Sequence, residues 1–213
     1  MNAISKSVQK IDHTSKANGS ALYVCDYPTD GMLFGRILRS HIARGKVLSV
    51  SLPDLPAGYF YVDKNDIPGV NEVHMILDDT PVFTDSVEFI GDPIGMLVGD
   101  DEHEVGRLLG EIEVEYEEKT PVFDARESEE VFFEYNIDKG DTDVAFKEAD
   151  RVFEESFETG LQEHIYLETN GMIADFKDGK MIVHGSIQCP YYVHTAVTRS
   201  TGLAPENVIV RRM

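Results

Sequence analysis

Apolar and polar residues alternate in several short stretches of the chain, a pattern typical of β-strands. In residues 112–117, isoleucine, valine and tyrosine alternate with three glutamates, so this strand is expected to turn one face to water. Other short runs are rich in β-branched and aromatic residues, which favour strands. Strands are therefore predicted over residues 21–25, 32–39, 47–52, 58–62, 71–77, 94–98, 112–117, 151–159, 171–176, 181–185 and 207–211.

A helix is predicted after residue 100, between two of these strands. Asp100 or Asp101 can accept a hydrogen bond from a free amide of the first turn. The apolar residues Val105, Leu108 and Leu109 share one face of this helix. A strand, a helix and a strand in succession indicate a right-handed crossover packed on a single sheet.

Two further helices are predicted toward the end of the chain. Asp141 can cap a short helix over Thr142–Glu148. Pro190 suits the first position of the second helix, and Gly202 suits its end.

Turn signals lie between these elements. The pair Asp178-Gly179 is a strong hairpin signal between two strand-like runs. Residues 52–57 carry two prolines, and we expect a turn of helix there.

Residues 118–134 form a polar, charged stretch of the kind that links domains. We place the first domain, with its lead-in, at 1–123, a linker at 124–134 and the start of a second domain at 135–213. The mixture of strands and helices predicts the α+β fold class.

Composition narrows the function classes. The chain has 213 residues, and 19 basic against 39 acidic side chains give a net charge of −20. So acidic a surface repels nucleic acids and anionic lipids, and we expect neither nucleic acid nor membrane as a partner. The polar first 20 residues lack a secretion signal, and no apolar run reaches the roughly 18 residues of a membrane span.

The two cysteines, Cys25 and Cys189, are too few for a disulfide framework and lack metal-site spacing. We interpret the chain as a reduced cytoplasmic protein, with both cysteines as unreactive core residues.

Few residues indicate chemistry by themselves. His164 and Glu168 lie four residues apart and could share a helix face, but no second histidine completes a metal motif, so a buried, hydrogen-bonded histidine is expected. Gln188 lies where a predicted strand meets a predicted helix, at an edge where ligand contacts often gather. Its amide can both donate and accept, although a surface amide in a turn remains the alternative.

Several segments, in order along the chain, resemble the large subunits of molybdenum hydroxylases of the xanthine dehydrogenase and aldehyde oxidase family. They include a segment similar to "V-x-F-x-G-D-P-V", one similar to "I-x-V-x-Y-E-x-L-P-x-V" and one similar to "N-I-x-x-G-D". The segments are 16–23, 32–40, 87–94, 112–122, 136–141, 162–168 and 186–188.

The resemblance implies an α/β hammerhead domain followed by the truncated start of a molybdopterin-binding domain. It also implies an enzyme that inserts water-derived oxygen at a heteroaromatic or aldehyde carbon, using a molybdenum bound to a pterin. Electrons would leave through two [2Fe-2S] clusters, usually to FAD, on other domains or subunits. The implied partners are the remainder of the large subunit, the iron-sulfur and FAD units, and a small heteroaromatic substrate.

Gln188 matches the family glutamine whose amide approaches an oxo ligand of the molybdenum, so the resemblance implies a cofactor-binding role for it. The family's glycine-rich cofactor loop and its catalytic carboxylate would both follow Met213, which implies no catalytic residue and no metal ligand within the chain. We therefore expect the 213 residues alone to be inactive, whether they represent a truncated polypeptide, a split gene product or a disrupted gene.

Three functions remain open. The segment 162–168 is closest to the xanthine dehydrogenase version, which favours xanthine or hypoxanthine as substrate. Nicotinate or aldehyde oxidation is the alternative within the same family. A non-catalytic assembly module that docks other subunits is the alternative outside it.

Overall fold

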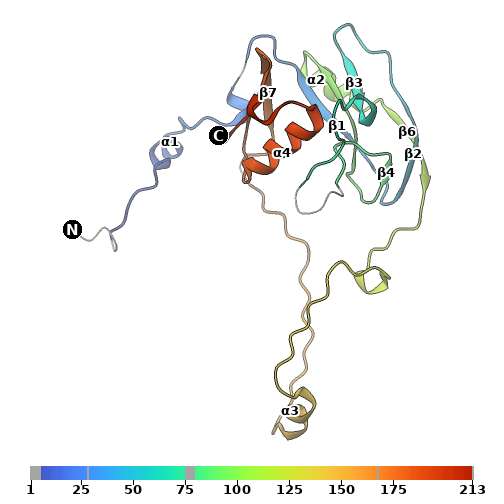
Figure 1. Cartoon of the computed structure of the whole chain (residues 1–213), viewed down its shortest axis with the longest axis vertical. Helices are drawn as coiled ribbons and strands as arrows, with labels where there is room; N and C mark the ends of the chain where they lie inside the picture. Colours follow the sequence, from blue (N-terminus) through green and yellow to red (C-terminus); the bar gives the residue numbers. More distant parts are fainter. Residues whose placement is uncertain (1–5, 28, 75–79, 167, 213) are drawn as a thin grey trace. The chain divides into compact units, whose positions relative to one another are not determined.

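The computed structural model describes residues 6–27, 29–74, 80–166 and 168–212 (Figure 1). The chain divides into two compact units: one comprises Met1–Pro121 with Glu168–Met213, and the other comprises Val122–Leu167. The helices are α1 His13–Ala17, α2 Glu102–Leu109, α3 Thr142–Glu148 and α4 Pro190–Thr201, with 3-10 turns η1 Val24–Asp26, η2 Lys64–Asp66, η3 Ala125–Glu127 and η4 Pro205–Asn207. The strands are β1 Phe34–Arg39, β2 Gly45–Ser51, β3 Phe60–Asp63, β4 Ser86–Val87, β5 Pro93–Gly99, β6 Glu113–Glu118, β7 Met172–Lys177, β8 Lys180–Gly185 and β9 Val208–Arg212.

Helix α2 covers a three-stranded antiparallel sheet of order β1-β5-β3. Leu97 of β5 and the helical residues Val105 and Leu108 form a fully buried apolar cluster. As predicted, the side chain of Asp101 caps the helix by accepting a hydrogen bond from the amide of Glu104 at 2.8 Å. Capping and burial of one apolar face together explain why this segment is helical despite Gly106.

The predicted crossover around α2 is wrong. Strand β5 lies between β1 and β3, whereas β6 pairs with β2 in a second sheet of order β4-β2-β6. The order of elements along the chain does not decide which strands pair, and β6 finds its antiparallel partner in β2 instead of β5.

A turn with buried ends, Val87 and Asp92, leads from β4 into β5. The carboxylate of Asp92 accepts hydrogen bonds from the amides of Glu88 at 2.7 Å and Phe89 at 3.2 Å, and Gly91 has a φ of +103°. Val87 is fully buried. The segment resembling "V-x-F-x-G-D-P-V" therefore builds this turn. Val87 packs in the core, Gly91 adopts the positive φ, and Asp92 accepts hydrogen bonds from backbone amides.

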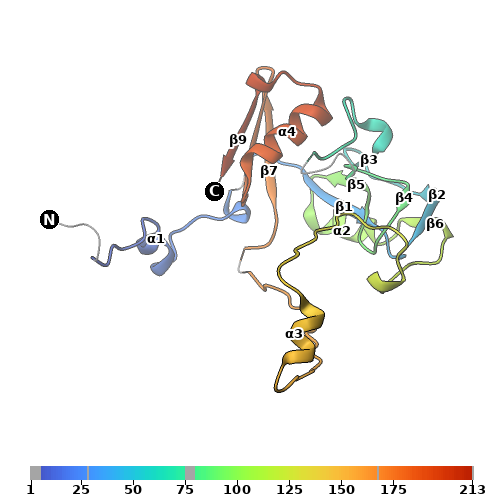
Figure 2. The ribbon, with the colours of Figure 1, turned by 60° about the horizontal axis from the view of Figure 1, so that its bottom comes forward.

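The third sheet has the order β7-β8-β9. Along the chain, α4 follows β8 and precedes β9. The hairpin predicted at Asp178-Gly179 is confirmed, with both residues at positive φ. Helix α4 begins with Pro190 and ends before Gly202 at φ +70°, also as predicted. Figures 1 and 2 both place α4 beside these strands, and α4 contacts β9.

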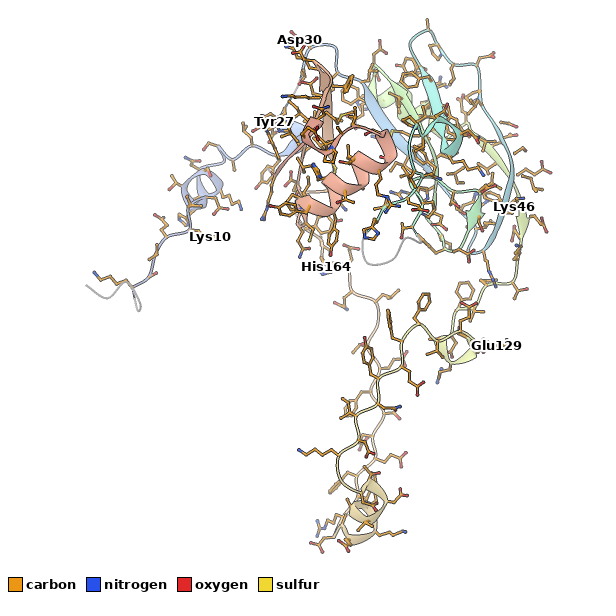
Figure 3. All side chains as sticks on the ribbon, in the orientation of Figure 1. Lys10, Tyr27, Asp30, Lys46, Glu129 and His164 are labelled. Atoms are coloured by element: carbon orange, nitrogen blue, oxygen red, sulfur yellow. The ribbon has the colours of Figure 1, made fainter. Side chains whose placement is uncertain are left out.

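The second unit, Val122–Leu167, contains η3 and α3 on an otherwise extended chain. Asp141 caps α3 by accepting from the amide of Val144 at 2.9 Å, as predicted. Every described residue from 125 to 166 is exposed. Figure 3 shows the side chains of this segment along its backbone, with Glu129 and His164 labelled.

Some predicted elements are absent. Residues 151–159 are extended without a strand partner among the described residues, residues 21–25 enter the 3-10 turn η1 instead of a strand, and residues 52–57 form no helix. The strand predicted at 71–77 is reduced to a single bridge between Val73 and Thr80, and its residues 75–77 lie outside the described residues. An extended segment forms a β-strand only where a neighbouring strand provides partners for its backbone hydrogen bonds.

Candidate functional site

The carboxyl ends of β8 and β9 meet at one edge of the third sheet. The two strands run parallel, and Gly185 lies opposite Arg212 in their register. Chain segments that leave parallel strands at their carboxyl ends are where open α/β sheets bind ligands. This edge is therefore the candidate site, and the loop from β8 to α4 lies on it.

Gln188 lies in this loop with its side chain exposed. The preceding residues alternate: Gly185 and Ile187 are buried, whereas Ser186 and Gln188 are exposed. A Cβ on Gly185 would stand 3.3 Å from Cγ1 of Ile187, so the backbone is closely packed at this point. Burial of Ile187 fixes the loop to the sheet and leaves the Gln188 carboxamide free to contact a ligand.

Helix α4 starts directly after Gln188. Cys189 is its N-cap residue, and no described side chain caps the helix there. Pro190 lacks an amide hydrogen, so it takes the first helical position without leaving a donor unsatisfied. The loop is thus held between a strand end and a helix start, which are both regular elements.

Two arginines bring positive charge to the same edge of a strongly acidic chain. Arg211 and Arg212 are exposed at the end of β9. The charge of Arg212 also acts on Lys16, whose pKa it lowers. The hydrogen bond from Lys16 to Asp12 is the larger influence and raises the pKa of Lys16 overall. Arg211 and Arg212 are consecutive residues of β9, so their side chains point to opposite faces of the sheet. Amide and guanidinium groups donate hydrogen bonds and are not ordinary metal ligands, so these donor types suit the oxygen atoms of an anionic cofactor.

The other candidate residues do not form a metal site. His164 is exposed on a non-helical segment, which contradicts the expected buried histidine. The carboxylate of Glu168 accepts a hydrogen bond from the amide of Val24 at 3.1 Å, a structural role. Among residues 6–27, 29–74, 80–166 and 168–212, no cluster of histidine, cysteine, aspartate and glutamate could hold a metal ion.

Cys25 and Cys189 are both free and exposed, so the prediction of buried cysteines is wrong. Cys25 lies in the 3-10 turn η1, and Cys189 occupies the N-cap position of α4. Neither of these elements has a buried side chain. Within the described part of the chain, no helix has the length and apolar character needed to span a bilayer.

Family comparisons cover nearly the whole chain. Residues 18–120 match the family described as "Aldehyde oxidase and xanthine dehydrogenase, a/b hammerhead domain", and residues 122–213 match the "Molybdopterin cofactor-binding domain". The hammerhead domain and the start of a molybdopterin-binding domain that were expected from the sequence are thereby confirmed, together with the α+β class.

Individual proteins agree with these families. Xanthine dehydrogenase of Blastobotrys adeninivorans is 34% identical over 98% of this chain, which spans 16% of that protein. The nicotinate dehydrogenase large molybdopterin subunit of Eubacterium barkeri is 29% identical over 89% of the chain, which spans 48% of that subunit. The crystal structure of quinoline 2-oxidoreductase from Pseudomonas putida 86 has the same fold, with a TM-score of 0.79, 21% identity, and coverage of 97% of this chain and 30% of its own.

Proposed function

Because this chain belongs to the xanthine dehydrogenase and aldehyde oxidase family of molybdenum hydroxylases, we propose that it forms the amino-terminal part of a molybdopterin-dependent large subunit. The leading substrate is xanthine or hypoxanthine. The substrate carbon gains an oxygen atom from water, loses a hydrogen, and releases two electrons to the enzyme. Family members are oxidoreductases, and the finer assignment is supported by the xanthine dehydrogenase relative.

One observation carries the proposal: the exposed Gln188 amide lies at the carboxyl edge of the β8–β9 pair. When bound, the molybdopterin cofactor supplies the redox and oxygen-insertion chemistry. Gln188 orients it by donating from the amide nitrogen, while Arg211 and Arg212 add positive charge beside the same edge. Gln188 is a poor general base, because a neutral amide does not take up a proton at physiological pH.

We propose the domain limits 1–123 and 135–213, with 124–134 as linker. The polar composition of the linker supports this division. The family matches at 18–120 and 122–213 are compatible with a junction in this region.

The remainder of the large subunit is the proposed partner of the second unit. Val122–Leu167 exposes many large apolar side chains, which a stable surface rarely leaves in water. They include Phe123, Phe132, Phe133, Ile137, Phe146, Phe153, Phe157, Leu161 and Ile165.

The [2Fe-2S] clusters and FAD belong to other domains or subunits in this proposal. The proposed location is the cytoplasm, because the two free cysteines suit a reducing compartment.

Substrate competition in the holoenzyme tests the proposed activity. We expect dye reduction with xanthine or hypoxanthine to exceed that with nicotinate or an aldehyde at equal concentration. Nicotinate is the second candidate, because a nicotinate dehydrogenase subunit matches 89% of the chain. Faster turnover with nicotinate or the aldehyde would replace the purine assignment.

An activity assay of the isolated 213 residues tests whether they are one part of an enzyme or a complete catalyst. We expect no xanthine-dependent dye reduction above background, because the family's glycine-rich cofactor loop and its catalytic carboxylate are both expected after Met213. Measured turnover would contradict this. A holoenzyme that keeps full activity without the chain would instead favour the assembly-module alternative.

A further inference from the structure

Helix α4 is held at its carboxyl end by a loop of the amino-terminal domain. The amide of Gly69 donates to the carbonyl of Ser200 at 2.8 Å, and the amide of Val70 donates to the carbonyl of Arg199 at 2.9 Å. The last carbonyls of a helix have no partner within the helix. Here two of them receive hydrogen bonds from residues about 130 positions away in the sequence.

Only glycine permits this approach. A Cβ at residue 69 would overlap the carbonyl oxygen of Arg199 and would stand 2.9 Å from that of Ser200. Both contacts involve backbone atoms, which cannot swing aside as a flexible side chain can. Any larger residue at position 69 must therefore displace the loop or the helix.

An ion pair lies beside these hydrogen bonds. Nη2 of Arg199 is 2.7 Å from Oε2 of Glu72, and both side chains are about one-third exposed. Its location near the negative end of the helix also favours the arginine. The loop and α4 are thus connected by two backbone hydrogen bonds and one charged contact.

The other end of α4 carries the candidate site. Gln188 lies two residues before Pro190, and the 12 residues of α4 span about 18 Å at ~1.5 Å per residue. A hydrogen-bonded helix transmits an axial shift along its length, because its turns are rigid compared with loops. A displacement at Ser200 would therefore reach the Gln188 loop.

We infer that Gly69, with the Glu72–Arg199 ion pair, positions α4 and through it the Gln188 amide at the edge of the β8–β9 pair. Gly69 is a positioning residue that does not touch substrate or cofactor. The inference rests on the proposed role of Gln188 for its functional meaning, whereas the mechanical connection rests on the contacts of α4 alone.

Nuclear magnetic resonance of the 213-residue chain tests the connection without any cofactor. Gly69→Ala should shift the amide peaks of residues 199–202 and also the backbone and carboxamide peaks of Gln188. Gly106→Ala is the matched control, because its Cβ would stand 3.8 Å from the nearest atom and has room. Glu72→Gln, which keeps the loop backbone, should produce a smaller shift in the same two regions.

Shifts confined to the loop and residues 199–202, with Gln188 peaks unchanged in both variants, would overturn the inference. If Gly69→Ala does not fold, Glu72→Gln alone decides by the same criterion. In the holoenzyme, Gly69→Ala should lower kcat by roughly 10- to 100-fold with little change in KM, as expected for a misplaced group. Moved Gln188 peaks with unchanged kcat would uphold the connection and contradict the proposed role of Gln188.

Discussion

Gly185 and Arg212 lie opposite each other at the carboxyl ends of β8 and β9. The chain leaves β8 at this point to form the Gln188 loop, and α4 then returns it to β9. A crossover of this kind was predicted around α2 and is present around α4 instead. Parallel pairing matters here because it brings the Gln188 loop and the arginines of β9 to one edge.

Leu108 should be a main contributor to stability of the first unit. Its side chain is 1% exposed in the cluster under α2, so Leu108→Ala should lower the free energy of unfolding by about 2–5 kcal/mol. Chemical denaturation followed by circular dichroism measures this. Leu48 is 53% exposed on β2, and Leu48→Ala should change stability by no more than ~0.5 kcal/mol. Equal losses in the two variants would contradict the assignment of the core.

Tyr61 should make stability fall at high pH. Burial raises the pKa of Tyr61 to about 12, above the value near 10 of an unfolded chain. A raised pKa contributes stability that is present below pH 10 and is lost as the pH rises through about 12. Unfolding free energies measured between about pH 9 and 12 should therefore fall more steeply in the parent chain than in Tyr61→Phe.

Tyr61→Phe should cost little at neutral pH, because the buried hydroxyl has no hydrogen-bond partner among the described residues. Tyr135 is 84% exposed, and Tyr135→Phe is the control that removes a phenol hydroxyl outside the core. A profile unchanged by Tyr61→Phe would show that Tyr61 does not titrate with a raised pKa.

The segment Val122–Leu167 should be the first region that trypsin cleaves in the isolated chain. Its described residues 125–166 are exposed, and outside η3 and α3 their backbone lies in no helix or strand ladder. Early cuts are expected after Lys139, Lys147 and Arg151, identified by mass spectrometry. In the holoenzyme the same bonds should be protected, since the proposed partner covers them. Equal cleavage rates in both preparations would remove this segment from the interface.

Local signals in the sequence predicted much of the fold. Asp101, Asp141, Pro190 and the Asp178-Gly179 hairpin all act on backbone groups within four residues, and each occurs as expected. Strand pairing depends on distant residues, and periodicity alone could not indicate that β6 pairs with β2. The same limitation explains the incorrect strand at 151–159, whose aromatic residues find no ladder partner in the described chain.

Only part of the candidate site could be predicted from the sequence. Gln188 was identified from a family resemblance and from its place between a strand and a helix, and the structure places it in the loop between β8 and α4, exposed. The approach of Gly69 to Ser200 leaves no trace in local sequence, because the two residues are far apart along the chain. Arg211 and Arg212 could have been noticed as two charges ending an apolar strand.

The role of Gln188 is the central claim, and Gln188→Ala in the holoenzyme tests it most directly. Ser186→Ala, an exposed neighbour in the same loop, is the matched control. We predict that Gln188→Ala lowers kcat by roughly 10- to 100-fold, the usual effect of losing a group that orients a metal centre, with an unchanged unfolding midpoint. A kcat equal to that of the parent and of Ser186→Ala would contradict the assignment of this edge as the cofactor site.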